Sequence, residues 1–341
     1  MEGELMATEM GQQPDVLSGL VGRRAALLRE LRAAIPSDIP GIILVARGSS
    51  DHAAIFGRYV LELATGLPVA LAAPSLHTLY DTRPRCEGFL AVGVSQSGRT
   101  PEIVTVLERL VAGGAHAVAV TNEPSSPLGR SASVVIELGA GDERAVPATK
   151  TFTAQLVAFA ILAEALGAVP WSARDWATLP AVVQLMLNDP HPAVAVAKDI
   201  SPSVGLLTVG RGFMFPIALE AALKLKETTS VLAEGYSAAD LRHGPFAVVQ
   251  RDFPVLSFSV AGPAGRDIED LTRWLKEERG AHVLRVSDGA DADLALPGDL
   301  PETLATIPAA IRAQQVAYEL ALCRGLNPDA PAGLTKVTPT S

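Results

Sequence analysis

The stretch FLAVGVSQSGRTPEIVTVLERL, residues 89–110, joins an apolar run to a hydroxyl-rich turn and then to a second apolar-rich segment. The apolar run predicts a buried strand over residues 89–94. Pro101 is favoured in the first turn of a helix, so a helix is expected to begin there. Strand, short turn and helix in this order are typical of a parallel α/β fold.

The turn itself, Ser95–Thr100, carries three hydroxyl side chains and one glycine. One interpretation is that the hydroxyls only cap the helix, because hydroxyl residues are favoured at that position. The other is that the free N–H groups at the positive helix end bind an anion such as phosphate, and that Gly98 lets the chain approach it closely. The turn alone leaves both interpretations open.

An internal repeat extends the argument to the rest of the chain. The stretch IILVARGSS resembles GLLTVGRGF, and each is a predicted strand that ends in Arg-Gly. Gly48 and Gly98 lie the same 164 positions before Gly212 and Gly262. Similar strand–helix units in matching order predict two similar subdomains, each with a parallel sheet and right-handed crossovers.

The two copies differ at the turn. Ser95–Gly98 corresponds to Ser259–Gly262, and the second copy has lost one hydroxyl and the amide. Capping gives no reason for this loss, whereas a ligand held by the first copy does. Ligands of parallel α/β sheets bind beyond the carboxyl ends of the strands, where both the turn and Gly48–Ser50 are expected.

The second copy carries a charged stripe in the helical stretch FPIALEAALKLKETTS. Glu220, Lys224 and Glu227 are spaced i, i+4, i+7 and therefore share one face. One interpretation is a solvated face with a single stabilising pair. The other is proton transfer, because His243 in the loop LRHGP would complete a set of acid, base and cation. Lys336 lies in the tail PAGLTKVTPTS, where disorder is the ordinary expectation.

The bulk composition limits the class of protein. A chain of 341 residues suggests one large or two medium domains, and the net charge of −9 argues against a nucleic-acid-binding protein. Cys86 and Cys323 form no disulfide or metal pattern, and the start MEGELMATEM lacks the regions of a signal peptide. A cytoplasmic location is expected. The apolar stretch 151–169 contains Gln155 and Glu164, which favours a buried core helix over a membrane span.

Five motifs together indicate a family: SQSGRT, VPATKTFTAQ, GRGFMFPIALEAALKLKE, LRHGP and GLTKVT. In order and spacing they resemble the double-SIS-domain sugar isomerase family, which includes the isomerase half of glucosamine-6-phosphate synthase. The resemblance implies an α/β fold of two SIS subdomains, each a flavodoxin-like three-layer sandwich. The expected parts are an N-terminal helical segment (1–38), a first SIS subdomain (39–190), a second SIS subdomain (200–326) and a tail (327–341) that carries Lys336.

The resemblance also implies roles. Glu227 would move a proton between C1 and C2 of the open-chain sugar, with help from Lys224. His243 would open the ring and would reach the site from the neighbouring subunit of a homodimer, and Lys336 would form a Schiff base with the keto sugar. The residues that would hold the phosphate and the sugar are Ser49, Ser50, Ser95, Gln96, Ser97, Thr100, Val146, Ala148 and Glu220.

The departures from the synthase narrow the expected reaction. Nothing before Ile39 resembles the glutaminase domain of the synthase, so the chain is not expected to take ammonia from glutamine. Arg99 stands where the family has an acidic residue, and Ala148 stands where it has a serine. The stretch RGSSDH, residues 47–52, looks more like the short glutaminase-free members, several of which are amino-sugar-phosphate deaminases.

The resemblance therefore implies a glucosamine-6-phosphate deaminase that forms fructose 6-phosphate and ammonia through an open-chain imine. No cofactor and no metal are expected, since no histidine pair has ligand spacing. The expected partners are a small sugar phosphate and a second copy of the chain, with neither nucleic acid nor membrane. Open alternatives are a deaminase or deglycase for galactosamine 6-phosphate or fructosamine-type phosphates, an isomerase or aminotransferase using ammonia from a separate source, and a non-catalytic sugar-phosphate-binding regulator.

Overall fold

The computed structural model of the protein describes residues 3–336. Its contacts divide these residues into two compact units, neither of which is continuous in sequence. Unit 1 holds residues 3–14, 144–149 and 171–336, and unit 2 holds residues 15–143 and 150–170. Residues 337–341 of the predicted tail lie outside the described residues, and Lys336 is the last residue inside.

Unit 2 contains a five-stranded sheet in which all neighbouring strands are parallel. The strands, in the spatial order β2-β1-β3-β4-β5, are β1 (Ile42–Val45), β2 (Val69–Leu71), β3 (Leu90–Val94), β4 (His116–Thr121) and β5 (Val134–Glu137). The helices are α2 (Gln13–Ala34, which starts in unit 1), α3 (Ser49–Thr65), α4 (Pro74–Thr78), α5 (Pro101–Ala112), α6 (Pro127–Arg130) and α7 (Lys150–Leu166).

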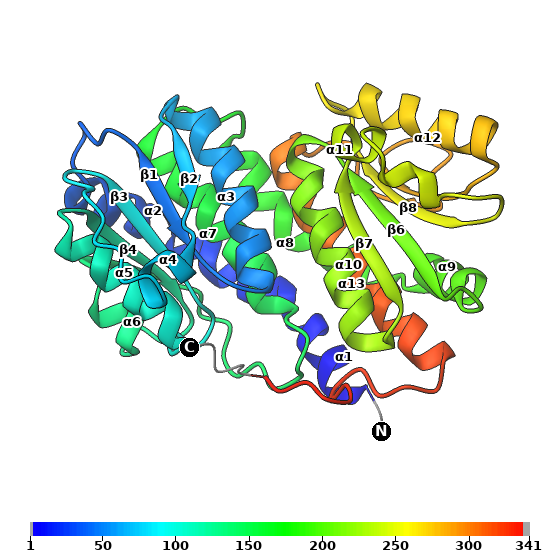
Figure 1. The fold of residues 1–341 in the computed structure, drawn as a ribbon, viewed down its shortest axis with the longest axis horizontal. Helices are drawn as coiled ribbons and strands as arrows, with labels where there is room; N and C mark the ends of the chain where they lie inside the picture. The colour runs from blue at the N-terminus through cyan, green and yellow to red at the C-terminus, as the bar shows by residue number, and fades with distance from the viewer. Residues whose placement is uncertain (1–2, 337–341) are drawn as a thin grey trace. The chain divides into compact units, whose positions relative to one another are not determined.

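The core of unit 2 follows from its apolar runs. All five residues of β3 are buried, as expected for a central strand covered on both faces. Helix α5 begins at Pro101, as predicted, and buries Ile103, Leu107 and Leu110 against the sheet. Helices α3 and α7 lie side by side (Figure 1). Nearly all of α7 is buried, which confirms the predicted core helix.

Unit 1 contains a second parallel five-stranded sheet. Its strands, in the spatial order β10-β9-β8-β6-β7, are β6 (Gly205–Gly210), β7 (Leu232–Ser237), β8 (Pro254–Ser259), β9 (His282–Ser287) and β10 (Leu294–Ala295). The helices are α1 (Glu4–Gly11), α8 (Ala173–Asn188), α9 (His191–Ile200), η1 (Gly212–Met214), α10 (Phe215–Thr229), α11 (Ala238–Arg242), η2 (Pro245–Val248), α12 (Gly265–Arg279) and α13 (Glu302–Cys323).

Helices cover both faces of the second sheet. On one face, α11 and α12 bury Leu241, Ile268 and Leu271. Helix α10 packs against α13, which also contacts α8 and α9 (Figure 1). Among the helices of residues 3–336, none combines the length and the apolarity that a membrane crossing requires.

The two sheets have the same topology. Numbered from its own first strand, each has the order 2-1-3-4-5, which is the flavodoxin-like order. Gly48 and Gly212 follow the equivalent first strands, with φ of 59° and 57°. The predicted α/β fold with two duplicated, flavodoxin-like subdomains is confirmed. The domain boundaries expected from the sequence remain predictions; packing groups α1, α8 and α9 with the second sheet.

This strand order fixes where a ligand can bind. The connections leave the first strand in one direction and the third strand in the other, and ligands of such sheets bind where the direction changes, at the carboxyl ends of these two strands. In unit 2 this point lies between β1 and β3, and in unit 1 between β6 and β8. We call these the first and second switch points.

Candidate active site

The first switch point gathers the six predicted phosphate-binding residues. Ser49 and Ser50 open α3, directly after β1, and the turn Ser95–Thr100 joins β3 to α5. Strands β1 and β3 are neighbours in register, with Ile42 opposite Leu90. The structure therefore brings the hydroxyl groups of both segments to the same edge of unit 2.

Backbone hydrogen bonds hold the turn in one shape. The Ser95 N–H donates to the Val120 carbonyl at 3.1 Å, and the Gln96 carbonyl accepts from the Asn122 N–H at 3.0 Å. Gly98 has a φ of 60°, and a Cβ at this position would come within 2.0 Å of Ser126 Oγ. Only glycine allows this approach, so the turn presents its hydroxyls on a fixed frame.

The capping interpretation of the turn is not borne out at Thr100. This residue is the N-cap of α5, yet its side chain makes no capping hydrogen bond. Its hydroxyl lies 3.2 Å from the Ser95 hydroxyl instead. Gly48, the N-cap of α3, has no side chain that could cap. Because the first N–H groups of a helix lack partners within the helix, two positive helix ends at this edge suit an anion.

Gln155 of α7 contacts Ser50, and this contact was not predicted from the sequence. Its side chain is 1% exposed, and its Nε2 donates to the Ser50 hydroxyl at 2.9 Å. Since Ser50 accepts this hydrogen bond, its own proton is available to an anion. The signal in the sequence was a glutamine within an almost wholly apolar helix.

An ion pair joins the two segments of the first switch point. Arg47 Nε lies 2.9 Å from Glu102 Oε2, and Arg47 Nη2 lies 3.1 Å from Oε1. The pair connects the loop after β1 to the first turn of α5. Unit 1 repeats it, with Arg211 Nε 3.4 Å from Asp267 Oδ2 in the first turn of α12. The Arg-Gly dipeptide that ends both predicted strands was its signal in the sequence.

Unit 1 holds a cluster of three charged side chains on α10. Lys224 Nζ lies 3.4 Å from Glu220 Oε1 and forms an ion pair with Glu227 Oε2. The side chains of Lys224 and Glu220 are 0% and 2% exposed, whereas that of Glu227 is 21% exposed. The solvated-face interpretation is therefore wrong for two of the three residues. The arrangement holds one partly accessible carboxylate beside a buried cation, as a proton-transfer group requires.

The other predicted residues of unit 1 lie apart along its chain. His243 is exposed at the C-cap of α11, and Lys336 is half-buried in a bend. Val146 and Ala148 are half-buried in the segment 144–149. The roles predicted for these four residues remain predictions.

At the second switch point the half-buried side chain of Glu302 approaches two glycines. A Cβ on Gly262 would come within 2.5 Å of Glu302 Oε2, and a Cβ on Gly212 within 3.5 Å of Glu302 Oε1. At the equivalent Gly48 a Cβ would meet no atom within 4 Å. Burial raises the pKa of the Glu302 carboxyl above its ordinary value. The Glu302 carboxylate thus lies beside Gly262, in the turn that lost its hydroxyl and amide in the second copy.

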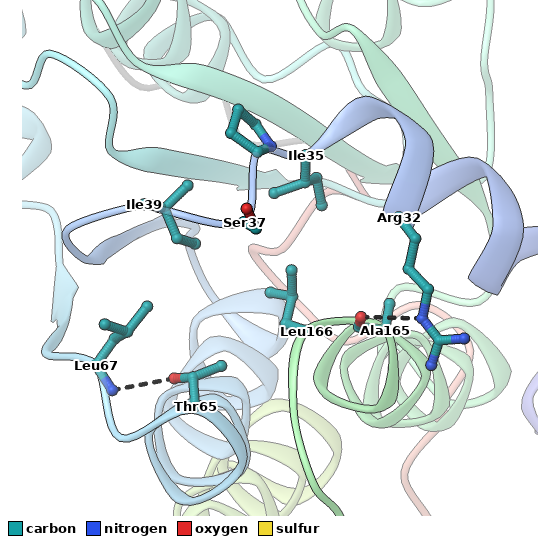
Figure 2. Close-up of a pocket in the computed structure, with 9 residues that line it drawn as sticks. Arg32, Ile35, Ser37, Ile39, Thr65, Leu67, Ala165 and Leu166 are labelled. Atoms are coloured by element: carbon teal, nitrogen blue, oxygen red, sulfur yellow. Dashed lines mark hydrogen bonds between the residues drawn. The ribbon is translucent and has the colours of Figure 1, made fainter.

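A cavity of about 400 Å³ lies at the opposite edge of unit 2 (Figure 2). Ile39 and Leu67 line it just before β1 and β2, so it lies at the amino ends of these strands. Its Arg32 guanidinium donates to the carbonyls of Ala165 and Glu164, at 3.2 and 2.9 Å, and so binds the last turn of α7. The cavity therefore does not belong to the first switch point.

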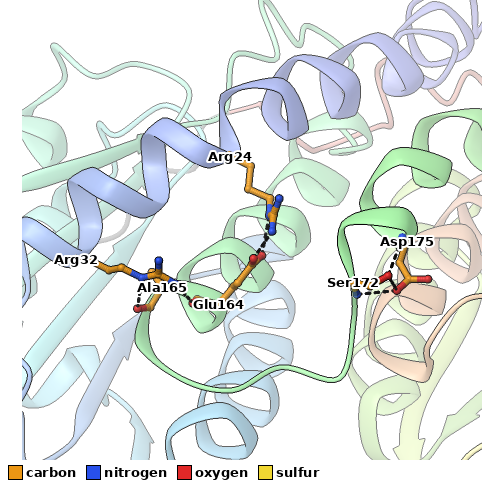
Figure 3. Close-up of polar contacts among 6 residues, drawn as sticks. All are labelled: Arg24, Arg32, Glu164, Ala165, Ser172 and Asp175. Atoms are coloured by element: carbon orange, nitrogen blue, oxygen red, sulfur yellow. Dashed lines mark hydrogen bonds and ion pairs between the residues drawn. The ribbon is translucent and has the colours of Figure 1, made fainter.

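Figure 3 shows the same end of α7, where Arg24 of α2 pairs with the Glu164 carboxylate. The Nε–Oε2 distance of this pair is 2.8 Å. These contacts fasten α2 to α7 within unit 2. Across residues 3–336, no three His, Cys, Asp or Glu side chains form a group that could hold a metal ion.

The model of the SIS domain family matches residues 37–165 and 200–322. Glutamine–fructose-6-phosphate aminotransferase (isomerizing) of Bradyrhizobium diazoefficiens is 31% identical, over 97% of this chain and 58% of that protein. The chain thus spans little more than half the length of this relative.

Two solved structures are similar over nearly their whole length. One, from Silicibacter pomeroyi DSS-3 and provisionally described as a phosphosugar isomerase, is 31% identical with a TM-score of 0.87, covering 96% of this chain and 100% of that one. The other, glucosamine-6-phosphate deaminase of Thermotoga maritima, is 23% identical with a TM-score of 0.82, covering 99% and 100%, and is a likeness in fold. By its two matched segments and its fold, the chain belongs to the SIS-domain family.

Proposed function

We propose that the protein is a phosphosugar isomerase that deaminates glucosamine 6-phosphate to fructose 6-phosphate and ammonia. The observation that carries the proposal is the α10 cluster, in which buried Lys224 holds the partly exposed Glu227 carboxylate. A protein that only bound sugar phosphates would have no need of this buried charged group, whose desolvation is costly. The sequence similarity to an isomerizing aminotransferase of a sugar phosphate supports related chemistry.

In this proposal the 6-phosphate binds at the first switch point. The Ser50 hydroxyl donates to a phosphate oxygen, as does whichever of the paired Ser95 and Thr100 hydroxyls accepts the hydrogen bond between them, and the ends of α3 and α5 supply positive potential. Ser49, Gln96 and Ser97 complete the anion site. Val146, Ala148 and Glu220 contact the sugar. Binding of the phosphate fixes the sugar so that its reacting carbons are held for proton transfer.

The chemistry then proceeds on the open-chain sugar. His243 moves the proton that opens the ring and frees the C1 aldehyde. Glu227 removes the C2 proton while the aldehyde oxygen gains one, and it returns a proton to C1 to give a 2-imine. Lys336 attacks C2 and displaces ammonia, and water hydrolyses the resulting Schiff base to the ketone of fructose 6-phosphate, which regenerates the lysine. The sum consumes one water for each ammonia.

The proposal is tested by incubating the purified protein with glucosamine 6-phosphate, without glutamine, and measuring ammonia and fructose 6-phosphate together. Equal release of both supports the deaminase. Galactosamine 6-phosphate, assayed in parallel, determines the preferred epimer at C4. Interconversion of aldose and ketose phosphates without ammonia would leave an isomerase and overturn the deaminase. Sugar-phosphate binding without any turnover would overturn the enzyme in favour of a regulator.

We also propose a homodimer in which each site takes His243 from the partner subunit. The variants His243→Ala and Glu227→Gln, each inactive alone, should complement when they are unfolded and refolded together. Random pairing would then restore about a quarter of wild-type activity, because half of the dimers contain one intact site. If the mixture stays inactive although mixed dimers form, His243 acts within its own chain or not at all.

A further inference from the structure

Helix α1 lies outside the segments that the family model matches, yet distant side chains hold its first turn. Its N-cap residue, Gly3, has no side chain to cap it. Instead, the Asp329 carboxylate accepts from the N–H groups of Leu5 and Met6, at 3.1 and 2.7 Å. Asn327 Oδ1 accepts from the Gly3 N–H at 3.3 Å and from the Asp329 N–H at 3.0 Å. The N-terminal helix is therefore capped by the segment that leads to Lys336.

The other end of α1 holds the segment 144–149. The buried Glu9 carboxylate accepts from the Arg144 N–H, and its Oε2 accepts from the Ala145 N–H at 3.2 Å. Ala145 packs in a small apolar cluster with Met6 and Met10. Two backbone donors and an apolar contact thus fix the start of this segment against α1.

The backbone of Asp329 connects the cap of α1 to the segment 144–149. Its carbonyl accepts from the Val146 N–H at 3.0 Å, next to the residues that Glu9 holds. At the far end of the segment, Gln314 Nε2 donates to the Thr149 carbonyl at 3.2 Å, and Gln314 Oε1 accepts from Gln13 Nε2 at 3.0 Å. Every part of this network belongs to unit 1.

We propose that Asp329 and Glu9 are positioning residues. They hold the segment that contains Val146 and Ala148 at a set position relative to the segment that leads to Lys336. The inference rests on the proposed function, in which one sugar contacts both segments. Asp329 lies seven positions before Lys336, a span of at most about 24 Å. Because Asp329 is anchored to the segment 144–149, the stretch that ends at Lys336 starts from a fixed point. This confines the lysine amine near the sugar and so raises its effective concentration there.

The test is reductive trapping of the Schiff base. The protein is incubated with fructose 6-phosphate and borohydride, and the adduct on Lys336 is followed by mass spectrometry. We expect Asp329→Ala to slow trapping about tenfold and to lower kcat, while affinity for inorganic phosphate stays unchanged. Asp329→Asn should retain part of the rate, because its amide oxygen still accepts one N–H.

Asp175→Ala is the matched control. Asp175 caps α8 in the same unit, where its Oδ2 accepts from the Ser172 N–H at 2.7 Å (Figure 3). It should trap at the wild-type rate even if its thermal stability falls as far as that of Asp329→Ala. Equal trapping rates in the two variants would overturn the inference.

A second readout separates this inference from the proposed function. If the wild type forms no adduct, the role of Lys336 fails, and hydrogen exchange of residues 144–149 then decides the inference. Faster exchange in Asp329→Ala than in Asp175→Ala supports the positioning network. Unchanged exchange in both variants overturns it.

Discussion

The amide of Gln155 donates a hydrogen bond to the Ser50 hydroxyl across 2.9 Å, and so ties a core helix to the first switch point. The contact leaves the Ser50 proton as the free donor of that hydroxyl. It also holds the first turn of α3 at a set distance from α7. Preorganised donors bind an anion without a further loss of side-chain freedom.

Replacing Gln155 with leucine should therefore weaken phosphate binding. We expect KM to rise about fivefold with kcat nearly unchanged, since one oriented hydrogen bond is lost in both ground and transition states. Ser50→Ala should have a similar effect, and the double variant should be little worse than either single one. Steady-state kinetics and calorimetric phosphate binding measure this. Additive losses would show that the two residues act independently.

Glu227→Gln should abolish proton transfer by this side chain without abolishing substrate binding. We expect kcat to fall by about 10²- to 10⁴-fold, while the affinity for sugar phosphate changes little. Glu234→Gln is a suitable control, because Glu234 is an exposed residue whose partner Lys226 is 4.0 Å away. If the Glu227→Gln variant kept its activity, Glu227 would not be the base of the proposed reaction.

Arg47→Ala should destabilise the protein more than Arg211→Ala. The first leaves the Glu102 carboxylate, which is 6% exposed, without its guanidinium, at a cost of about 1–3 kcal/mol. Asp267, the partner of Arg211, is 38% exposed and also binds Arg242 at 2.7 Å, so a loss of less than about 1 kcal/mol is expected. Thermal unfolding compares the variants. Equal losses would contradict the unequal burial of the two carboxylates.

Glu302→Gln should stabilise the protein at neutral pH. Burial raises the folded-state pKa of this carboxyl above its ordinary value of 4.5, so the charged form opposes folding. The penalty is absent below the unfolded pKa and is complete once the pH exceeds the folded pKa. Melting temperatures of variant and wild type should converge below about pH 4 and separate as the pH rises. Glu277→Gln, at an exposed position of α12, is the matched control for the substitution itself.

The fold could be predicted because its signals are local or periodic. Pro101 marks the start of α5, and the offset between Gly48 and Gly212 revealed the duplication that the strand orders confirm. Apolar runs distinguish buried strands from turns without knowledge of the rest of the chain. The two segments predicted to bind phosphate lie at one edge, as expected, because parallel strands end at the same edge of a sheet.

The polar contacts were not predictable in the same way. Gln155 and Ser50 are 105 positions apart, and Arg47 and Glu102 are 55 apart. Periodicity indicates which face of a helix is buried, but not which polar group of a distant segment contacts that face. Likewise, the charge pattern of α10 fits a solvated face, whereas the packing of α10 within unit 1 buries Lys224.

The cap on α1 has a consequence for folding during synthesis. Met6 precedes its acceptor on Asp329 by 323 positions. Domains begin to fold as the chain emerges from the ribosome, and contacts distant in sequence form late. The N–H groups in the first turn of α1 therefore have no acceptor until the 323 positions that lead to Asp329 have been translated. Both sheets are made in that interval, so the helix that precedes them is capped after them.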